Sequence, residues 1–139
     1  MERENDIESG FRINNILLME NNFKREATAI FDKNKTENIV DIDVNVQLSE
    51  NFILVNETLR YFEKYNGIEQ VSVTIRMAGV FEKIGNTPLD PQEFGEVNGA
   101  AIIFPYIREH LTSLSAKAGL GLIILPPFNF TKKSTVVSK

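Results

Sequence analysis

The sequence contains no cysteine and no tryptophan, and histidine occurs only once, at position 110. Without cysteine there are no disulfides, thiolate metal sites or cysteine nucleophiles, and a single histidine argues against a histidine-based metal site. A glycine-rich phosphate-binding loop is also lacking, which argues against ATP-driven activity. We therefore expect no metal and no cofactor.

Long hydrophobic runs and an excess of basic charge are lacking too. No run of about 18 apolar residues occurs, and no basic start precedes an apolar segment, so we expect no membrane insertion, no secretory signal and a cytoplasmic location. The net charge of -4 argues against nucleic acid as a partner, because nucleic-acid-binding proteins usually carry a basic patch. The length of 139 residues fits one domain over residues 1–139, with polar, flexible ends at residues 1–10 and 131–139.

Alternation of apolar and polar residues predicts an antiparallel sheet. Between Val40 and Leu48 every second residue is apolar, which is typical of a half-buried strand with one wet face. Asn66-Gly67 is a favoured hairpin turn, and Gly79 interrupts a later strand as a candidate bulge. The expected strands are residues 11–19, 40–48, 52–65 and 71–81, and residues 21–37 form a long connection.

A long helix is predicted over residues 98–117. Asp90 followed by Pro91 is typical of an N-cap with proline at the first helical position, and Gly119 or Gly121 ends the helix. Pro105 removes one backbone hydrogen bond and predicts a kink. Apolar side chains with helical spacing form one stripe, which consists of Ile102, Ile103, Tyr106, Ile107, His110, Leu111 and Leu114. The sheet and the helix together indicate the α+β class.

The helix and the segment after it resemble the SecB family of export chaperones. Members of that family carry F-P-Y-x-R-E on a helix, then a hydroxyl-rich turn, a glycine break and an extended L-x-P-x-N-F segment. The matching residues here are Phe104-Pro105-Tyr106-Ile107-Arg108-Glu109 and Leu125-Pro126-Pro127-Phe128-Asn129-Phe130. The resemblance is specific over residues 98–130 and implies a four-stranded antiparallel sheet with one long kinked helix on one face. It also implies a homotetramer built as a dimer of dimers.

The resemblance implies a groove for unfolded polypeptides, lined by apolar residues of the second strand and of the tail. The predicted substrate-binding residues are Ile42, Val44, Val46, Phe128 and Phe130, with Phe23 and Phe31 of the long connection as a mobile wall. The alternative is that the strand residues pack the core and that the connection residues only anchor their loop. Phe128 and Phe130 are the strongest candidates, since an extended, proline-rich tail has fewer ways to be core.

The resemblance also implies partner contacts. The family presents acidic residues on its outer sheet face to the export motor SecA, and Glu20 occupies one such position while Ile16, Phe23 and Thr74 occupy others. Asp41 and Asp43 keep the outer face acidic, so Glu20, Asp41 and Asp43 are the predicted partner-binding residues. The missing acids argue against SecA binding. The predicted oligomer interface consists of Ile103, Tyr106, Ile107, His110 and Leu111.

Two further features reduce the number of functions that the sequence allows. The tail ends in polar and β-branched residues where SecB proteins continue into a second helix, so that helix is expected to be absent. Asp41 and Asp43 share one strand face, but their neighbours indicate an ordinary wet surface and not a catalytic cleft. We therefore predict a non-enzymatic, ATP-independent holdase for preproteins or a dedicated client. The alternatives are a chaperone of a toxin-antitoxin system and a tetrameric scaffold that binds a folded partner.

Overall fold

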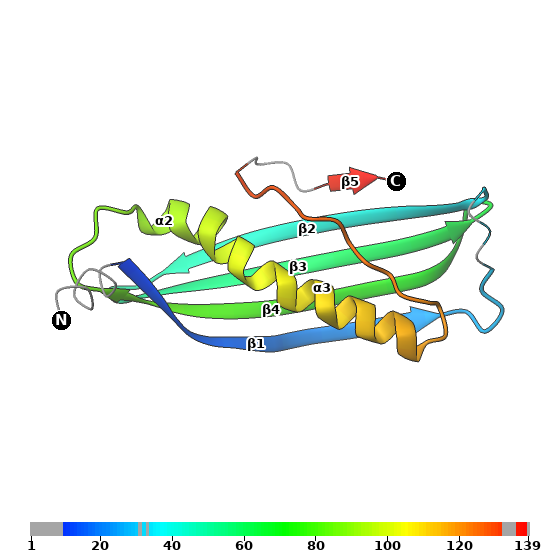
Figure 1. Cartoon of the computed structure of the whole chain (residues 1–139), viewed down its shortest axis with the longest axis horizontal. Coiled ribbons are helices and arrows are strands. Elements are labelled where there is room, and N and C mark those ends of the chain that lie inside the picture. The colour runs from blue at the N-terminus through cyan, green and yellow to red at the C-terminus, as the bar shows by residue number, and fades with distance from the viewer. Residues whose placement is uncertain (1–9, 31, 33, 132–135, 139) are drawn as a thin grey trace.

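The structure is a computed structural model that describes residues 10–30, 32, 34–131 and 136–138. Its main elements are β1 (Gly10–Arg25), β2 (Thr36–Leu48), β3 (Phe52–Tyr65), β4 (Ile68–Ile84), α2 (Pro91–Glu93), the π-helix η1 (Phe94–Gly99), α3 (Ala100–Lys117) and β5 (Val136–Ser138). The strands form one antiparallel sheet in the order β1-β4-β3-β2-β5. The long helix lies across one face of the sheet, and the chain after it runs back over the same face (Figure 1). The predicted four-stranded sheet with one long helix is confirmed.

The meander of β2, β3 and β4 follows the alternation of the sequence. Every second residue of β3 from Ile53 to Glu63 is buried, and the residues between them are only partly covered. Asn66 and Gly67 both have positive φ, at 53° and 80°, as a two-residue hairpin turn requires. The inward side chains pack against α3 and form the core, whose largest fully buried members include Tyr61, Phe81, Ile42, Leu59, Ile75 and Ile103.

β1 is longer than the sequence predicted. The strand continues through Arg25, and its register against β4 shifts between Ile13 and Asn15 and again between Leu18 and Glu20. A bulge moves the following side chains to the opposite face, which is why the apolar pattern of this segment has no regular alternation. Phe23 consequently belongs to β1 and not to the connection, contrary to the prediction.

The helical segment begins before the predicted residue 98. The Asp90 carboxylate accepts a hydrogen bond of 2.9 Å from the backbone N–H of Glu93, which confirms the predicted N-cap. Helical residues then continue without a break from Pro91 to Lys117, and Pro105 lies inside α3. Gly119, at φ +73°, ends the helix, and the backbone N–H of Leu120 bonds to the carbonyl of Ser115 at 2.9 Å.

Gly79 has a different role from the predicted bulge. β4 pairs with β3 and β1 without a register shift at this residue. A Cβ atom at Gly79 would lie only 2.7 Å from Cδ1 of Ile103, so the glycine permits α3 to approach the sheet closely. The predicted flexible ends fall largely outside the described residues, and within the described part of the chain no helix follows α3.

Candidate functional site

The segment that follows α3, residues 119–130, runs beside the helix in an extended conformation. Gly119 and Gly121 have positive φ and turn the chain away from the helix axis. The hydroxyl of Thr112 donates to the carbonyl of Ile123 at 2.7 Å, and the N–H of Ile123 donates to the hydroxyl of Ser115 at 3.0 Å. The hydroxyl residues of the helix thus fix the tail in position over the sheet.

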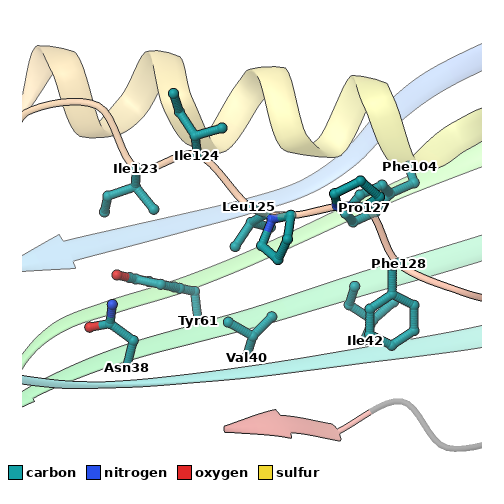
Figure 2. Close-up of a pocket in the computed structure, with 11 residues that line it drawn as sticks. Asn38, Val40, Ile42, Tyr61, Phe104, Ile123, Ile124, Leu125, Pro127 and Phe128 are labelled. Carbon is teal, nitrogen blue, oxygen red and sulfur yellow. The ribbon is translucent and has the colours of Figure 1, made fainter. Parts of the chain in front are cut away.

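Two adjoining hollows lie between this tail and β2. The first has a volume of about 450 Å³ and is lined by Asn38, Val40, Ile42, Tyr61, Phe104, Ile123, Ile124, Leu125, Pro126, Pro127 and Phe128 (Figure 2). The second, of about 430 Å³, is lined by Thr36, Asn38, Tyr61, Glu63, Leu120, Leu122, Ile123 and Ile124. The hollows share Asn38, Tyr61, Ile123 and Ile124, so they form one continuous site, which we call the β2–tail groove.

The end of the β2–tail groove near Phe128 is apolar. Val40 and Ile42 line it from the strand, while Phe104 and Phe128 line it from the helix and the tail, and the labelled side chains converge on the space between them (Figure 2). The Phe104 and Phe128 ring centroids are 6.3 Å apart. Phe130 packs 5.8 Å from Phe104 and 5.0 Å from Phe128, and only 8% of its surface is exposed. The tail prolines restrict the backbone, so these rings are presented with little loss of conformational freedom.

The opposite end of the groove is more polar, because Thr36, Asn38 and Glu63 line it beside leucine and isoleucine side chains of the tail. The Tyr61 hydroxyl donates to Oε1 of Glu63 at 2.9 Å, and Nε2 of Gln70 donates to Oε2 at 3.3 Å. Gln70 also exchanges two hydrogen bonds with the backbone of Ile30 in the connection after β1, at 2.8 and 2.6 Å. Burial raises the pKa of Glu63, and the two hydrogen bonds partly oppose that rise. Burial and the neighbouring Glu63 also raise the pKa of Tyr61.

The structure places the predicted substrate-binding residues in different environments. Ile42 borders the β2–tail groove but is only 1% exposed and belongs to the core, as the alternative held for the strand residues. Phe128 is half-buried and lines the groove, and Phe130 is buried against Phe128. Val44 and Val46 are half-buried on β2 and are not among the groove's lining residues. Val46 instead lies against Gly95 of η1. A Cβ atom on Gly95 would be only 2.9 Å from Cγ1 of Val46.

The predicted mobile wall of the groove is not formed by Phe23. This residue lies on β1, at the opposite edge of the sheet from β2, so its assignment to this groove is wrong because the strand extends further than the sequence pattern indicated. Phe31 lies outside the described residues. The sequence patterns did not predict four residues that line the groove, namely Asn38, Tyr61, Glu63 and Phe104. One sequence signal could have pointed to Glu63. Glu57 and Glu63 occupy inward positions of β3, where they interrupt an otherwise apolar face.

The predicted partner-binding residues lie on the sheet face opposite α3, and two of them are paired with arginines. Oδ2 of Asp41 lies 3.5 Å from Nη1 of Arg60, and Oε1 of Glu20 lies 3.6 Å from Nε of Arg76. Asp43 is exposed. This face is therefore of mixed charge and not simply acidic, which weakens the case for an acidic docking surface.

The predicted oligomer interface is only partly accessible. Ile103, Ile107 and Leu111 are completely buried against the sheet of the same chain, so the prediction that they contact a second copy directly is wrong for these three. The reason is that the apolar stripe of α3 covers its own sheet. Tyr106 is 53% exposed, and His110 is half-buried with Nε2 3.1 Å from Oδ1 of Asn21.

Among the described residues, no group of three or more histidine, cysteine, aspartate or glutamate side chains is arranged to hold a metal ion. Across the same part of the chain, no helix is both long enough and apolar enough to span a membrane.

Known proteins share both the sequence and the fold. A Methanocaldococcus jannaschii protein described as uncharacterized is 30% identical over 94 residues, an alignment that covers 65% of this chain and 61% of that protein. The protein-export protein SecB of Saccharophagus degradans is 28% identical over 101 residues, with 63% and 55% covered. The aligned regions thus span less than two thirds of these relatives. The SecB of Hahella chejuensis is 28% identical over 126 residues, with 86% and 77% covered.

Solved structures extend the similarity to the whole fold. The SecB-like chaperone Rv1957 of Mycobacterium tuberculosis, solved with a ChAD peptide from the HigA1 antitoxin, superposes with a TM-score of 0.72 at 14% identity, covering 91% of this chain and 95% of that one. A Streptococcus agalactiae protein of unknown function gives a TM-score of 0.55 at 12% identity, with 84% and 96% covered. The sequence also matches the family of the preprotein translocase subunit SecB over residues 4–133. The chain therefore belongs to the SecB family.

Proposed function

We propose that this protein is an ATP-independent holdase chaperone, which binds unfolded polypeptides in the β2–tail groove and keeps them competent for translocation or folding. The observation that carries the proposal is the groove itself, a largely apolar hollow between β2 and the extended tail. Phe104, Phe128 and Ile42 line one end of this hollow. The chain's membership of the SecB family supports the proposal.

The groove suits an extended chain better than a folded surface. Each Å² of apolar client surface that the groove covers stabilises the complex by about 25 cal/mol. Many shallow apolar contacts therefore favour any segment that exposes apolar side chains, and not one particular sequence. β5 pairs only with Ile39, Val40 and Asp41 of β2. Along the rest of that edge no other described strand is paired, so backbone groups of β2 remain available to an added strand.

Assembly and location form part of the same proposal. A homotetramer in the cytoplasm would place several grooves on one particle, so that one long client could occupy more than one of them and bind with greater avidity. The residues available for assembly are exposed apolar side chains of α3 and of β1. They include Ile102, Tyr106, Leu17, Leu18 and Met19.

The test is suppression of aggregation. A chemically unfolded, unrelated protein is diluted into buffer with stoichiometric amounts of the chaperone and no nucleotide, and light scattering is followed. We expect strong suppression by the native protein, weaker suppression by Phe128→Ala, and no change with Phe52→Ala, a matched control at an exposed position far from the groove. Aggregation that proceeds equally with and without the chaperone would refute the proposal. Selective binding of a folded partner would favour a scaffold instead.

A dedicated client is the second candidate function. The structural similarity to a SecB-like chaperone solved with an antitoxin peptide favours it, as does the mixed charge of the outer sheet face, where Arg60 and Arg76 accompany the acidic residues. A toxin-antitoxin gene pair beside the gene for this chain, and binding of that antitoxin well above binding of other unfolded chains, would support it. Tight, salt-sensitive binding to SecA that is lost in Asp43→Lys would instead support general export.

A further inference from the structure

The short strand β5 (Val136–Ser138) lies along the edge of β2 (Figure 1). It pairs antiparallel with residues 39–41 of β2. Val40, at the centre of this stretch, and Ile42, just beyond it, line the β2–tail groove. A segment of the chain itself therefore occupies the backbone edge of the part of β2 that lines the groove.

The contact between β5 and β2 is small. β2 pairs with β3 from Thr36 to Leu48, whereas β5 covers only residues 39–41. A strand this short makes few backbone hydrogen bonds, each of modest net strength in water, and every residue that it orders loses conformational freedom. These opposing effects are of similar size, which favours exchange of β5 between paired and unpaired states. Because β3 holds β2 on its other side, the sheet does not depend on β5.

The composition of β5 suits a partner that can be replaced. Val136 and Val137 are β-branched, and such residues favour an extended strand. Residues 131–139 contain no aromatic residue, no leucine and no isoleucine. A client with larger apolar side chains therefore gains burial in the groove that valine and serine do not match, and this difference favours displacement of β5.

We propose that β5 is an intramolecular competitor for the edge of β2, which pairs with β2 while the groove is empty and is displaced by a client that adds a strand there. The inference rests on the proposed function, because it concerns how clients gain access to the groove. β5 lowers the apparent affinity for a client in proportion to the fraction of molecules in which the edge is open. It also covers part of an edge that would otherwise pair with other exposed strands.

The first experiment measures client affinity in the full chain with Val136→Pro and Val137→Pro combined. Proline cannot donate a backbone hydrogen bond. Neighbouring residues of an antiparallel strand direct their N–H groups to opposite edges, so the double substitution removes a donor toward β2 whichever residue supplies it. The conservative counterpart is Val136→Thr with Val137→Thr, which keeps the size and the strand propensity of both side chains. The client is a fluorescently labelled lactalbumin, reduced and carboxymethylated so that it stays unfolded, and binding is followed by anisotropy.

We expect the proline variant to bind this client about 10-fold more tightly than the native chain does, which corresponds to an edge that is open in roughly one tenth of the native molecules. The threonine variant should bind like the native chain. Thermal unfolding should be the same for all three proteins, because the pairing of β2 with β3 and the packing of α3 are unchanged.

The second experiment is hydrogen exchange on the native chain, and it needs no substitution. Addition of the unfolded lactalbumin should increase exchange at the amides of residues 136–138, because the displaced strand loses its partner. The amides of residues 39–41 that face β5 should remain protected by the client strand. The amides of Val73 and Ile75, in the centre of β4, are the control and should not change.

The outcomes separate the two proposals. Equal affinity of the proline variant and the native chain, or client binding that leaves exchange at residues 136–138 unchanged, would refute the competitor while the holdase proposal stands. Weaker binding by the proline variant would also refute it, because β5 would then help to hold the client. Binding by the proline variant alone would support both proposals, with the native edge closed. If neither chain binds the client, the holdase proposal fails and the competitor fails with it.

Discussion

At the scale of single residues, Glu57 is the most unusual member of the core. It lies on the inward face of β3 between Val44 of β2 and Met77 of β4, and it is completely buried. Neither of its carboxyl oxygens has a hydrogen-bond partner in the described part of the chain. Burial raises its pKa from the ordinary value of 4.5 to about 9, so the side chain is neutral at pH 7 in the folded protein.

This raised pKa predicts that the fold becomes less stable as pH rises. Below pH 4.5 both folded and unfolded chains hold the proton, whereas between pH 4.5 and 9 only the folded chain does. The unfolded state then binds fewer protons, so the free energy of unfolding falls by up to about 1.4 kcal/mol per pH unit in that window. Thermal unfolding should therefore occur at a lower temperature at pH 8 than at pH 5.5.

The matching variant is Glu57→Met, which removes the titrating group and keeps most of the volume. We expect it to stabilise the protein at pH 8 by on the order of 3 kcal/mol, since a buried carboxyl without partners is costly, and to flatten the pH dependence. Glu69→Gln, at an exposed glutamate, is the control. An equally steep pH dependence in Glu57→Met would show that another group is responsible.

The two tail phenylalanines should behave differently when truncated. Phe130 is buried, so Phe130→Ala should lower the free energy of unfolding by about 3–5 kcal/mol, as core truncations do. Phe128 is half-buried and lines the groove, so Phe128→Ala should weaken peptide binding with a smaller loss of stability. Chemical denaturation and peptide titration of both variants test this. Equal losses of stability would assign both rings to the core.

At the scale of elements, the position of the tail depends on side-chain hydroxyls. Thr112→Val and Ser115→Ala remove the two hydrogen bonds to Ile123, which are worth about 1 kcal/mol each. We expect the double variant to remain folded but to lose protection from hydrogen exchange at Ile123 and Leu125 and to bind peptides more weakly. Ser113→Ala, which removes the neighbouring hydroxyl, is the control. Unchanged exchange would mean that packing alone holds the tail.

The sequence predicted the meander, the N-cap at Asp90 and the end of the helix at Gly119, because each depends on a local rule. It did not predict the full length of β1, because two bulges break its alternation. The role of Gly79 was missed for another reason. Only the approach of Ile103 from a distant segment shows that a side chain has no space there, and periodicity carries no information on such contacts.

The candidate site was predicted only in part, again because a local sequence pattern carries no information on contacts between distant segments. Phe128 was identified because a proline-rich aromatic tail is unusual in any core. Glu63 was missed, because its place in the groove depends on the position of the tail and on the hydrogen bond from Gln70, and neither can be read from the local sequence. The stripe of α3 was assigned to assembly, although burying the chain's own sheet uses Ile103, Ile107 and Leu111 completely.

At the scale of the whole molecule, two of the apolar surfaces that the described residues leave exposed could serve assembly. One is the outward face of α3, where Ile102 is 41% and Tyr106 53% exposed, one helical turn apart. The other is the edge of β1, where Leu17 and Leu18 are exposed beside the unpaired backbone of an edge strand. If each of these surfaces pairs with the same surface of a second copy, the two interfaces together produce a dimer of dimers.

We therefore expect light scattering to give four times the chain mass at micromolar concentration. Ile102→Glu with Tyr106→Glu places charge on the helix face, where burial of an unpaired carboxylate is unfavourable, and should reduce the mass to that of a dimer held through β1. Leu89→Glu, at an exposed leucine before α2, is the control and should remain tetrameric. Because the core residues of α3 are untouched, circular dichroism of the double variant should match that of the native protein. A native protein that is monomeric throughout this concentration range would refute the tetramer, and a double variant that is monomeric would place both interfaces on the helix.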